Sequence, residues 1–277
     1  MTRKPIGFWI CIYAALAMMA VYNLLPFFWM ATSALKSEIE VVSYPATLWP
    51  REITFAAYSK IWLQEGFVRY FANSLIVSLS TAGLSSLVGV FAAYGFSRFG
   101  FRGRNALMTA FLATQMIPGV LLVGPYFKLL SLVNLYDTLL GLILAQTSIT
   151  LPFSVWMLKG YLDTVPTEID QVAMMDGATR LQTLILTILP NVLPGLVATM
   201  IFAFLLAWGD LLWALCLIND PSRMTITLGI AQLVGQFRVA WSEIMAATMI
   251  ATIIPAAFYL FLQAYLIKGF TESAVKE

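Results

Sequence analysis

The stretch EIDQVAMMDGATRLQTLILTILP, residues 168–190, lies between two long apolar segments and differs from both. It begins with acidic and amide side chains, is interrupted at Asp176-Gly177, and continues as an apolar segment that ends in Pro190. This order predicts a short helix over about residues 168–176, followed by a second helix. A helix of about two turns is marginal in water by itself, so another surface must cover its apolar side.

Local signals define both helices. Thr167 and Asp170 have the spacing of a capping box at the first helix, and Glu168 and Asp170 suit the positive end of the helix dipole. Gly177 is expected to end this helix in a left-handed conformation. The second helix is expected to start at Thr179 with a capping box to Gln182, and one apolar face is expected at Leu181, Leu184, Ile185 and Ile188.

The exposed side of the first helix has two interpretations. Ile169, Val172 and Ala173 fall on one face, with Met174 and Met175 beside them. Such a helix either lies on the lipid surface or docks on a protein. Surface-lying helices typically carry Lys and Arg on the polar face, whereas this polar face is acidic and lipid surfaces are anionic. The pattern therefore favours a protein partner.

The composition indicates an integral membrane protein. The chain has 277 residues, of which 60% are hydrophobic and 11% are charged, and its mean hydropathy is +0.84. Soluble domains usually carry about 25% charged residues. A spanning helix needs roughly 20 apolar residues, so we expect an all-α protein with six transmembrane helices, at about residues 8–32, 70–96, 106–130, 138–159, 192–217 and 244–267.

The orientation follows from basic residues in short loops. Arg98, Arg102 and Arg104 cluster in residues 97–105 without an acid beside them. We therefore expect this turn and both termini to be cytoplasmic. The expected organisation is a cytoplasmic N-terminus (1–7), a first span with an outer segment (8–68), a main domain of five helices (69–268) and a cytoplasmic tail (269–277).

Several function classes are disfavoured. A net charge of +2 gives no reason to expect a nucleic-acid partner. The chain has no His, and Cys11 and Cys216 lie far apart in apolar runs, so neither a metal site nor a disulfide is expected. We expect no catalytic residues, because no nucleophile–base set or paired acids are visible. The phosphate-binding pattern G-x-x-x-x-G-K-[ST] is also absent.

A few polar or aromatic side chains inside the expected spans are candidates for a substrate path: Asn73, Gln115, Gln146, Trp208 and Asp210. Asp210 is costly to place in a membrane. Either it lines a path or gate, or it pairs with backbone or another span. Tryptophans also gather at membrane interfaces for physical reasons, which is the alternative for Trp208.

The stretch QVAMMDGATRLQTLILTILP resembles the EAA motif of ABC-importer permeases, roughly E-A-A-x-x-D-G-A followed by an apolar helix ending in Pro. Residues 73–105, 115–144 and 208–218 and the tail GFTESAVKE are similar to the carbohydrate branch of that family, in particular to its second maltose-type permease subunit. The sequence departs from the motif at Gln171, where Glu is usual, at Val172, where Ala is usual, and at Leu184, where Phe is common.

The resemblance implies a type I ABC-importer permease fold and a function. The chain would be a multi-pass permease subunit in a bacterial inner (plasma) membrane, importing a sugar or sugar derivative. Its partners would be a second permease subunit, two copies of a cytoplasmic ATPase that holds ATP and Mg²⁺, and an external solute-binding protein, so this chain would bind no cofactor. Residues 167–177 would be the coupling helix, with contacts from Glu168, Asp170, Gln171, Ala173, Met174, Met175, Asp176, Gly177 and Ala178. The alternative is a secondary transporter driven by an ion gradient.

Overall fold

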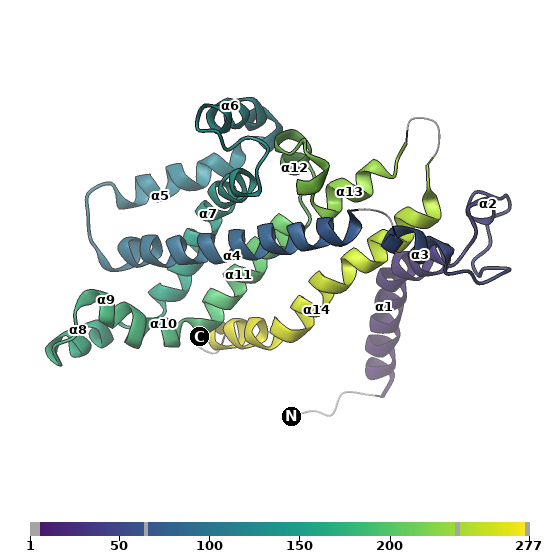
Figure 1. Cartoon of the computed structure of the whole chain (residues 1–277). Helices are drawn as coiled ribbons and strands as arrows, with labels where there is room; N and C mark the ends of the chain where they lie inside the picture. Colours follow the sequence, from purple (N-terminus) through teal and green to yellow (C-terminus); the bar gives the residue numbers. More distant parts are fainter. Residues whose placement is uncertain (1–5, 64–65, 236–238, 275–277) are drawn as a thin grey trace. The chain divides into compact units, whose positions relative to one another are not determined.

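A computed structural model describes residues 6–63, 66–235 and 239–274 and divides the chain into two compact units (Figure 1). Unit 1 comprises Met1–Phe67 and Ile230–Ile253, and unit 2 comprises Val68–Gly229 and Ile254–Glu277. The expected terminal segments lie partly outside the described residues. The described helices are α1 (Ile6–Ala34), α2 (Glu38–Val41), α3 (Ala56–Leu63), α4 (Phe67–Arg98), α5 (Arg104–Ala113), η1 (Thr114–Met116), α6 (Gly119–Leu132), α7 (Leu139–Asp163), α8 (Thr167–Met175), α9 (Arg180–Gln182), η2 (Thr183–Ile188), α10 (Leu189–Asn191), α11 (Leu193–Trp208), α12 (Leu212–Leu217), η3 (Pro221–Arg223), α13 (Ile226–Gln232) and α14 (Trp241–Ala274).

The helices confirm the all-α membrane fold. α1, α4, α7 and the first part of α14 are long and apolar enough to cross a membrane. Two further pairs of helices reach that length only when each bent pair is taken together, which gives four to six spans. In the part of the chain that the structure describes, the sole extended pairing is an isolated bridge between Val234 and Val239.

The third expected span, residues 106–130, is wrong as a continuous helix. Arg104–Met116 and Gly119–Leu132 meet at 99°. Ile117 is extended, with φ −78° and ψ 120°, because the ring of Pro118 disfavours helical geometry in the residue before it. Pro118 and Gly119 therefore mark a sharp break, whereas Pro125 lies inside the continuous helix α6.

The fifth expected span, residues 192–217, is also wrong as a single helix. α11 ends at Trp208, and α12 starts again at Leu212. Asp210 lies in the break, where its carboxylate accepts hydrogen bonds from the backbone N–H groups of Trp213 and Ala214 at 3.2 Å each. A second bend of 83° separates Arg180–Asn191 from Leu193–Trp208.

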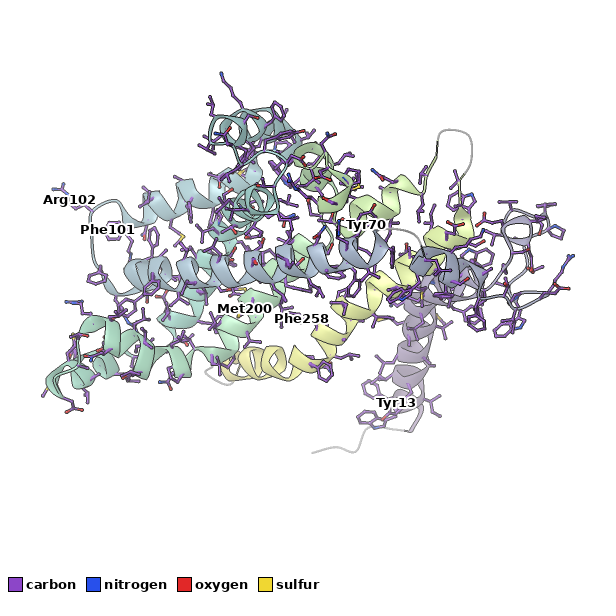
Figure 2. All side chains as sticks on the ribbon, in the orientation of Figure 1. Tyr13, Tyr70, Phe101, Arg102, Met200 and Phe258 are labelled. Atoms are coloured by element: carbon purple, nitrogen blue, oxygen red, sulfur yellow. The ribbon has the colours of Figure 1, made fainter. Side chains whose placement is uncertain are left out.

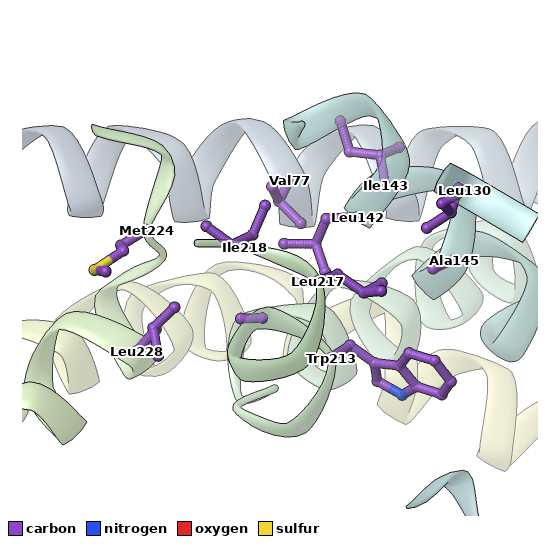
Figure 3. Close-up of a cluster of buried hydrophobic side chains, with 11 residues drawn as sticks. Val77, Leu130, Leu142, Ile143, Ala145, Trp213, Leu217, Ile218, Met224 and Leu228 are labelled. Carbon is purple, nitrogen blue, oxygen red and sulfur yellow. The ribbon is translucent and has the colours of Figure 1, made fainter. Parts of the chain in front are cut away.

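Two buried apolar clusters hold unit 2 together. The first joins α4, α6, α7, α12 and the start of α13, with Leu142 and Leu217 near its centre and Trp213 at one side (Figure 3). The second joins α4, α5, α7 and η2 and includes Leu158 and Ile188, which are fully buried. Gly195 of α11 lies directly against the ring of Tyr161 of α7, so that no side chain fits between these two helices.

Unit 1 combines the exposed helix α1 with the polar segment that follows it. Lys36 is buried, donates a hydrogen bond to the carbonyl of Thr47 and lies 5.0 Å from the ring centroid of Trp29. The Glu40 carboxylate accepts from the backbone N–H of Arg51 at 2.8 Å. This hydrogen bond lowers the pKa of Glu40.

Candidate functional site

The short helix predicted at residues 168–176 is present as α8. Its N-cap residue is Pro166, which makes no side-chain capping bond. The predicted capping box between Thr167 and Asp170 is therefore wrong. Asp170 instead points into unit 2, where 6% of its surface is exposed, because a buried cation competes for its carboxylate.

That cation is Arg98, the last residue of α4. Its Nε lies 3.0 Å from Oδ2 of Asp170, and the two side chains are 6% and 8% exposed. The hydroxyl of Tyr94, one turn earlier in α4, donates to Oδ1 of Asp170 at 3.0 Å. The acid of α8 is thus held by two side chains of one spanning helix, and in Figure 1 α8 and α9 lie beside the end of α4 that leads into α5.

The same guanidinium also reaches the end of α7. Its two terminal nitrogens donate to the carbonyl oxygens of Leu162 at 3.2 Å and Val165 at 3.0 Å. Carbonyl groups at a helix C-terminus lack partners within the helix and favour a nearby positive charge. Arg98 therefore connects the ends of α4 and α7 with α8. Phe101 and Arg102 project from the following turn (Figure 2).

Gly177 ends α8 as predicted. Its φ is +90°, and its N–H donates to the carbonyl of Met174 at 3.1 Å. The next N–H, of Ala178, donates to the carbonyl of Ala173 at 3.0 Å. These two bonds make up a Schellman motif, which fixes the direction in which the chain leaves α8.

A substitution at Gly177 tests this motif. A Gly177→Val variant is expected to lose about 1–2 kcal/mol of folding stability, because a branched side chain at positive φ places Cβ against the following carbonyl. Gly177→Asn is the matched control, since Asn tolerates this conformation. Thermal unfolding of the purified proteins in detergent measures the difference. Equal melting temperatures for the two variants would contradict the assignment.

The outward side of α8 is apolar at its centre and acidic at its start. Met175 is 85% exposed and Val172 is 57% exposed, while Glu168 and Gln171 are also exposed. A groove of about 440 Å³ lies along this side, lined by Glu168, Ile169, Val172, Ala173, Asp176, Ala178 and Thr187. Apolar side chains presented beside such a groove are suited to bind another protein surface.

The second helix starts as predicted and then departs from the expected face. Thr179 and Gln182 form the capping box. Residues Thr183–Ile188 form a π-helical turn. A π-helix has more residues per turn than an α-helix, so the residues of the predicted apolar face no longer line up on one side. Leu184 and Ile188 are buried, whereas Leu181 is 55% and Ile185 is 45% exposed. The prediction that all four share one buried face is wrong for this reason.

The five candidates for a substrate path all lie in unit 2. Gln146 and Asp210 form a hydrogen bond, with the amide donating to the carboxylate at 3.1 Å. The amide of Asn73 donates to the carbonyls of Ser222 and Met224, and Gln115 donates to that of Ile149. Trp208 packs edge-on against Phe71 at 5.6 Å. Their role in a substrate path stays a prediction.

Sequence reasoning missed the partners of Asp170. It assigned Arg98 only to the orientation of the chain and gave Tyr94 no role. The available signal was the place of Asp170 next to Ile169, an apolar residue that packs against the second buried cluster. An acid on a covered face requires a cation or several donors, and residues 97–105 hold a predicted cluster of cations on the same side of the membrane.

Known proteins share the whole of this architecture. The family described as binding-protein-dependent transport system inner membrane component matches residues 85–272. The chain belongs to this family. The inner membrane ABC transporter permease protein YcjP of Escherichia coli (strain K12) is 34% identical over 99% of this chain and 98% of its own length.

Two further comparisons agree with this membership. The trehalose/maltose transport system permease protein MalG of Thermococcus litoralis is 32% identical to this permease, over 94% of each chain. A chain from the crystal structure of a bacterial ABC transporter involved in the import of the acidic polysaccharide alginate superposes with a TM-score of 0.82. It covers 96% of this chain and 99% of its own length at 19% identity, so this likeness concerns the fold alone.

Membership establishes the general activity. The chain is the membrane-spanning permease subunit of an ATP-driven, binding-protein-dependent importer in the inner membrane. It acts with an ATPase and a solute-binding protein, and it is a transport subunit, not a catalytic one.

Proposed function

We propose that this permease imports a carbohydrate or carbohydrate derivative and pairs with a second, different permease chain. The trehalose/maltose permease, similar over nearly its whole length, supports the substrate class. In such an assembly two copies of a cytoplasmic ATPase would bind ATP and Mg²⁺, and an external binding protein would deliver the solute. Both termini of this permease would be cytoplasmic, on the side of the basic turn at residues 97–105.

We further propose that residues 167–177 form the coupling helix, with the exposed side of α8, which excludes the buried Asp170, seated on the ATPase. The observation that carries this proposal is the exposed apolar side of α8 beside the 440 Å³ groove. Val172 and Met175 would enter the partner surface, with Met adapting to its shape. Glu168 is the exposed acid of the first turn and would supply the negative charge that the motif glutamate would carry at position 171, since Gln171 is neutral and Asp170 is buried.

The mechanism proposed from this geometry is a lever. When the ATPase dimer closes, it would displace α8, and α8 would carry the ends of the spanning helices with it. The breaks at Pro118 and at residues 209–211 would let α6 and α12, the helices that follow them, reorient separately from α4 and α7. The permease would then alternate between inward-facing and outward-facing states, with Asp210, Gln146, Asn73, Gln115 and Trp208 as candidates for the path.

A double substitution, Val172→Glu with Met175→Glu, tests the docking role. Two carboxylates on this side would have to be desolvated at the interface, so the variant permease is expected to lose the ATPase. Co-purification of the ATPase with tagged permease, followed by solute uptake, measures this. The matched control is Ile39→Glu, which changes an apolar residue of α2 that is 82% exposed. Normal ATPase recovery with the double variant would refute the docking role.

The substrate class and energy source have separate tests. The solute-binding protein that works with this permease is expected to bind a neutral or derivatised sugar in a titration against a solute panel. Uptake is expected to stop when cellular ATP is depleted and to continue when only the ion gradient is collapsed. Uptake that survives ATP depletion but stops with an uncoupler would favour an ion-coupled transporter instead.

A further inference from the structure

We propose that Arg98 is a positioning residue that makes α8 and the ends of α4 and α7 move as one body. The inference rests on the proposed coupling role of α8 and assigns the connection through which its displacement reaches the spanning helices. Arg98 touches neither solute nor nucleotide in this proposal. It acts by holding α8 at one angle.

The charges at this junction are almost completely removed from solvent. The side chains of Arg98 and Asp170 are 6% and 8% exposed, with 3.0 Å between Nε and Oδ2. A charge in such surroundings is stable only when it is paired and hydrogen-bonded. Any rotation of α8 that withdrew Asp170 would leave the guanidinium unpaired in the protein interior, so the pair strongly disfavours independent motion of α8.

The shape of the guanidinium explains why one residue can join three helices. Its nitrogens point in fixed directions within one plane. Nε lies 3.0 Å from Oδ2 of Asp170 in an ion pair without hydrogen-bond geometry, while the two terminal nitrogens donate to the carbonyls of Leu162, in the last turn of α7, and Val165, just after it. A Lys ammonium is a single charge centre on a flexible chain, and it cannot occupy all three positions together.

Three neighbouring contacts hold the same region, but each is a weaker interaction than the Arg98–Asp170 ion pair. Tyr94 donates to the second oxygen of Asp170 at 3.0 Å. Ser97 donates to Asp163 at 2.7 Å, and Arg180 lies 4.9 Å from the ring centroid of Phe99. The first two fix side-chain orientation, and the third connects the start of α9 to the residue after α4. The ion pair is the contact whose loss would free α8 itself.

This arrangement predicts a specific defect when the junction is weakened. α8 would still present its exposed side to the ATPase, because Val172 and Met175 are exposed and take no part in the contacts of Arg98. However, α8 would pivot between the turn at residues 164–166 and the Schellman motif at Gly177. ATP hydrolysis would then proceed with less displacement of α4 and α7, and less solute would be moved for each ATP.

The test uses the complete transporter in proteoliposomes, with Arg98→Lys and Asp170→Asn in this permease. We expect solute transported per ATP hydrolysed to fall by about tenfold, while the amount of assembled complex and its maximal ATPase rate stay within about twofold of the unmodified transporter. Lys159→Gln is the control. It removes the more exposed ion pair with Asp163 in α7 and is expected to leave the ratio unchanged.

The outcomes separate this proposal from the docking role. Assembled Asp170→Asn complexes with an unchanged ratio would overturn it, because a purely structural pair affects the amount of complex and not the ratio. If that variant does not assemble, Tyr94→Phe replaces it, because this substitution removes only the hydrogen bond from Tyr94 to Asp170. The solute transported per ATP is then expected to fall by less, and an unchanged ratio would overturn the proposal. Failure of the docking proposal has another signature, namely normal ATPase recovery with the Val172→Glu, Met175→Glu permease.

Discussion

A Gly141→Ala permease is expected to lose about 3 kcal/mol of folding stability. The added Cβ would lie 2.1 Å from the backbone oxygen of Leu135. That oxygen cannot move aside easily, because it accepts a hydrogen bond from Thr138 at 2.7 Å, and the N–H of Leu135 is bonded to the carbonyl of Leu130 at 2.8 Å. The substitution therefore has to displace the start of α7 from the buried cluster that surrounds Leu142.

The matched control is Gly160→Ala, the same substitution near the other end of α7. No heavy atom lies within 4 Å of a Cβ added at Gly160. Alanine favours a helix over glycine by up to about 1 kcal/mol, so this variant is expected to be as stable as the original or more stable. Melting temperatures of the purified complexes in detergent distinguish the two. Similar changes for both variants would show that the contact at Leu135 is not restrictive.

An Asp210→Ala permease is expected to lose both stability and transport. The carboxylate satisfies the backbone N–H groups of Trp213 and Ala214 and the amide of Gln146. A buried donor left without an acceptor costs roughly 1–3 kcal/mol, and the three donors at Asp210 are part-buried. We therefore expect α12 to detach from α7, with a clear fall in melting temperature and a large loss of solute uptake.

The Asp210→Asn variant separates the two interpretations of this residue. Its side-chain oxygen still accepts hydrogen bonds at the start of α12, so a capping role predicts stability near that of the original and uptake reduced by less than about fivefold. If the negative charge itself contacts the solute, uptake falls much further while the melting temperature is retained. Uptake kinetics and thermal unfolding of the same preparations give the answer.

Local chemistry predicted much of this protein. Apolar length and low charge predicted a helical membrane protein, and four helices have that character on their own. Gly177 and the Thr179–Gln182 capping box were located correctly because each depends on residues within one turn. The motif around Asp176-Gly177 also indicated the family, which the match over residues 85–272 confirms.

The errors share a different physical origin. A proline in an apolar segment signals a disturbed helix, but packing against neighbouring helices decides whether the result is a kink or the 99° break seen at Pro118. The π-helical turn of η2 likewise separates Leu184 and Ile188 from Leu181 and Ile185. These outcomes depend on how much space the neighbouring helices leave. A short stretch of sequence carries no information about that space.

The sequence by itself thus determined that α8 would exist, where it would end, and that its exposed side would be apolar. Only the tertiary structure decided which way Asp170 faces. The sequence left two alternatives for that carboxylate. It could cap the N-terminus of its own helix, or it could contact a partner protein. The fold brings Arg98 and Tyr94 to 3.0 Å from it in the interior, where a low dielectric makes the ion pair stronger than either alternative.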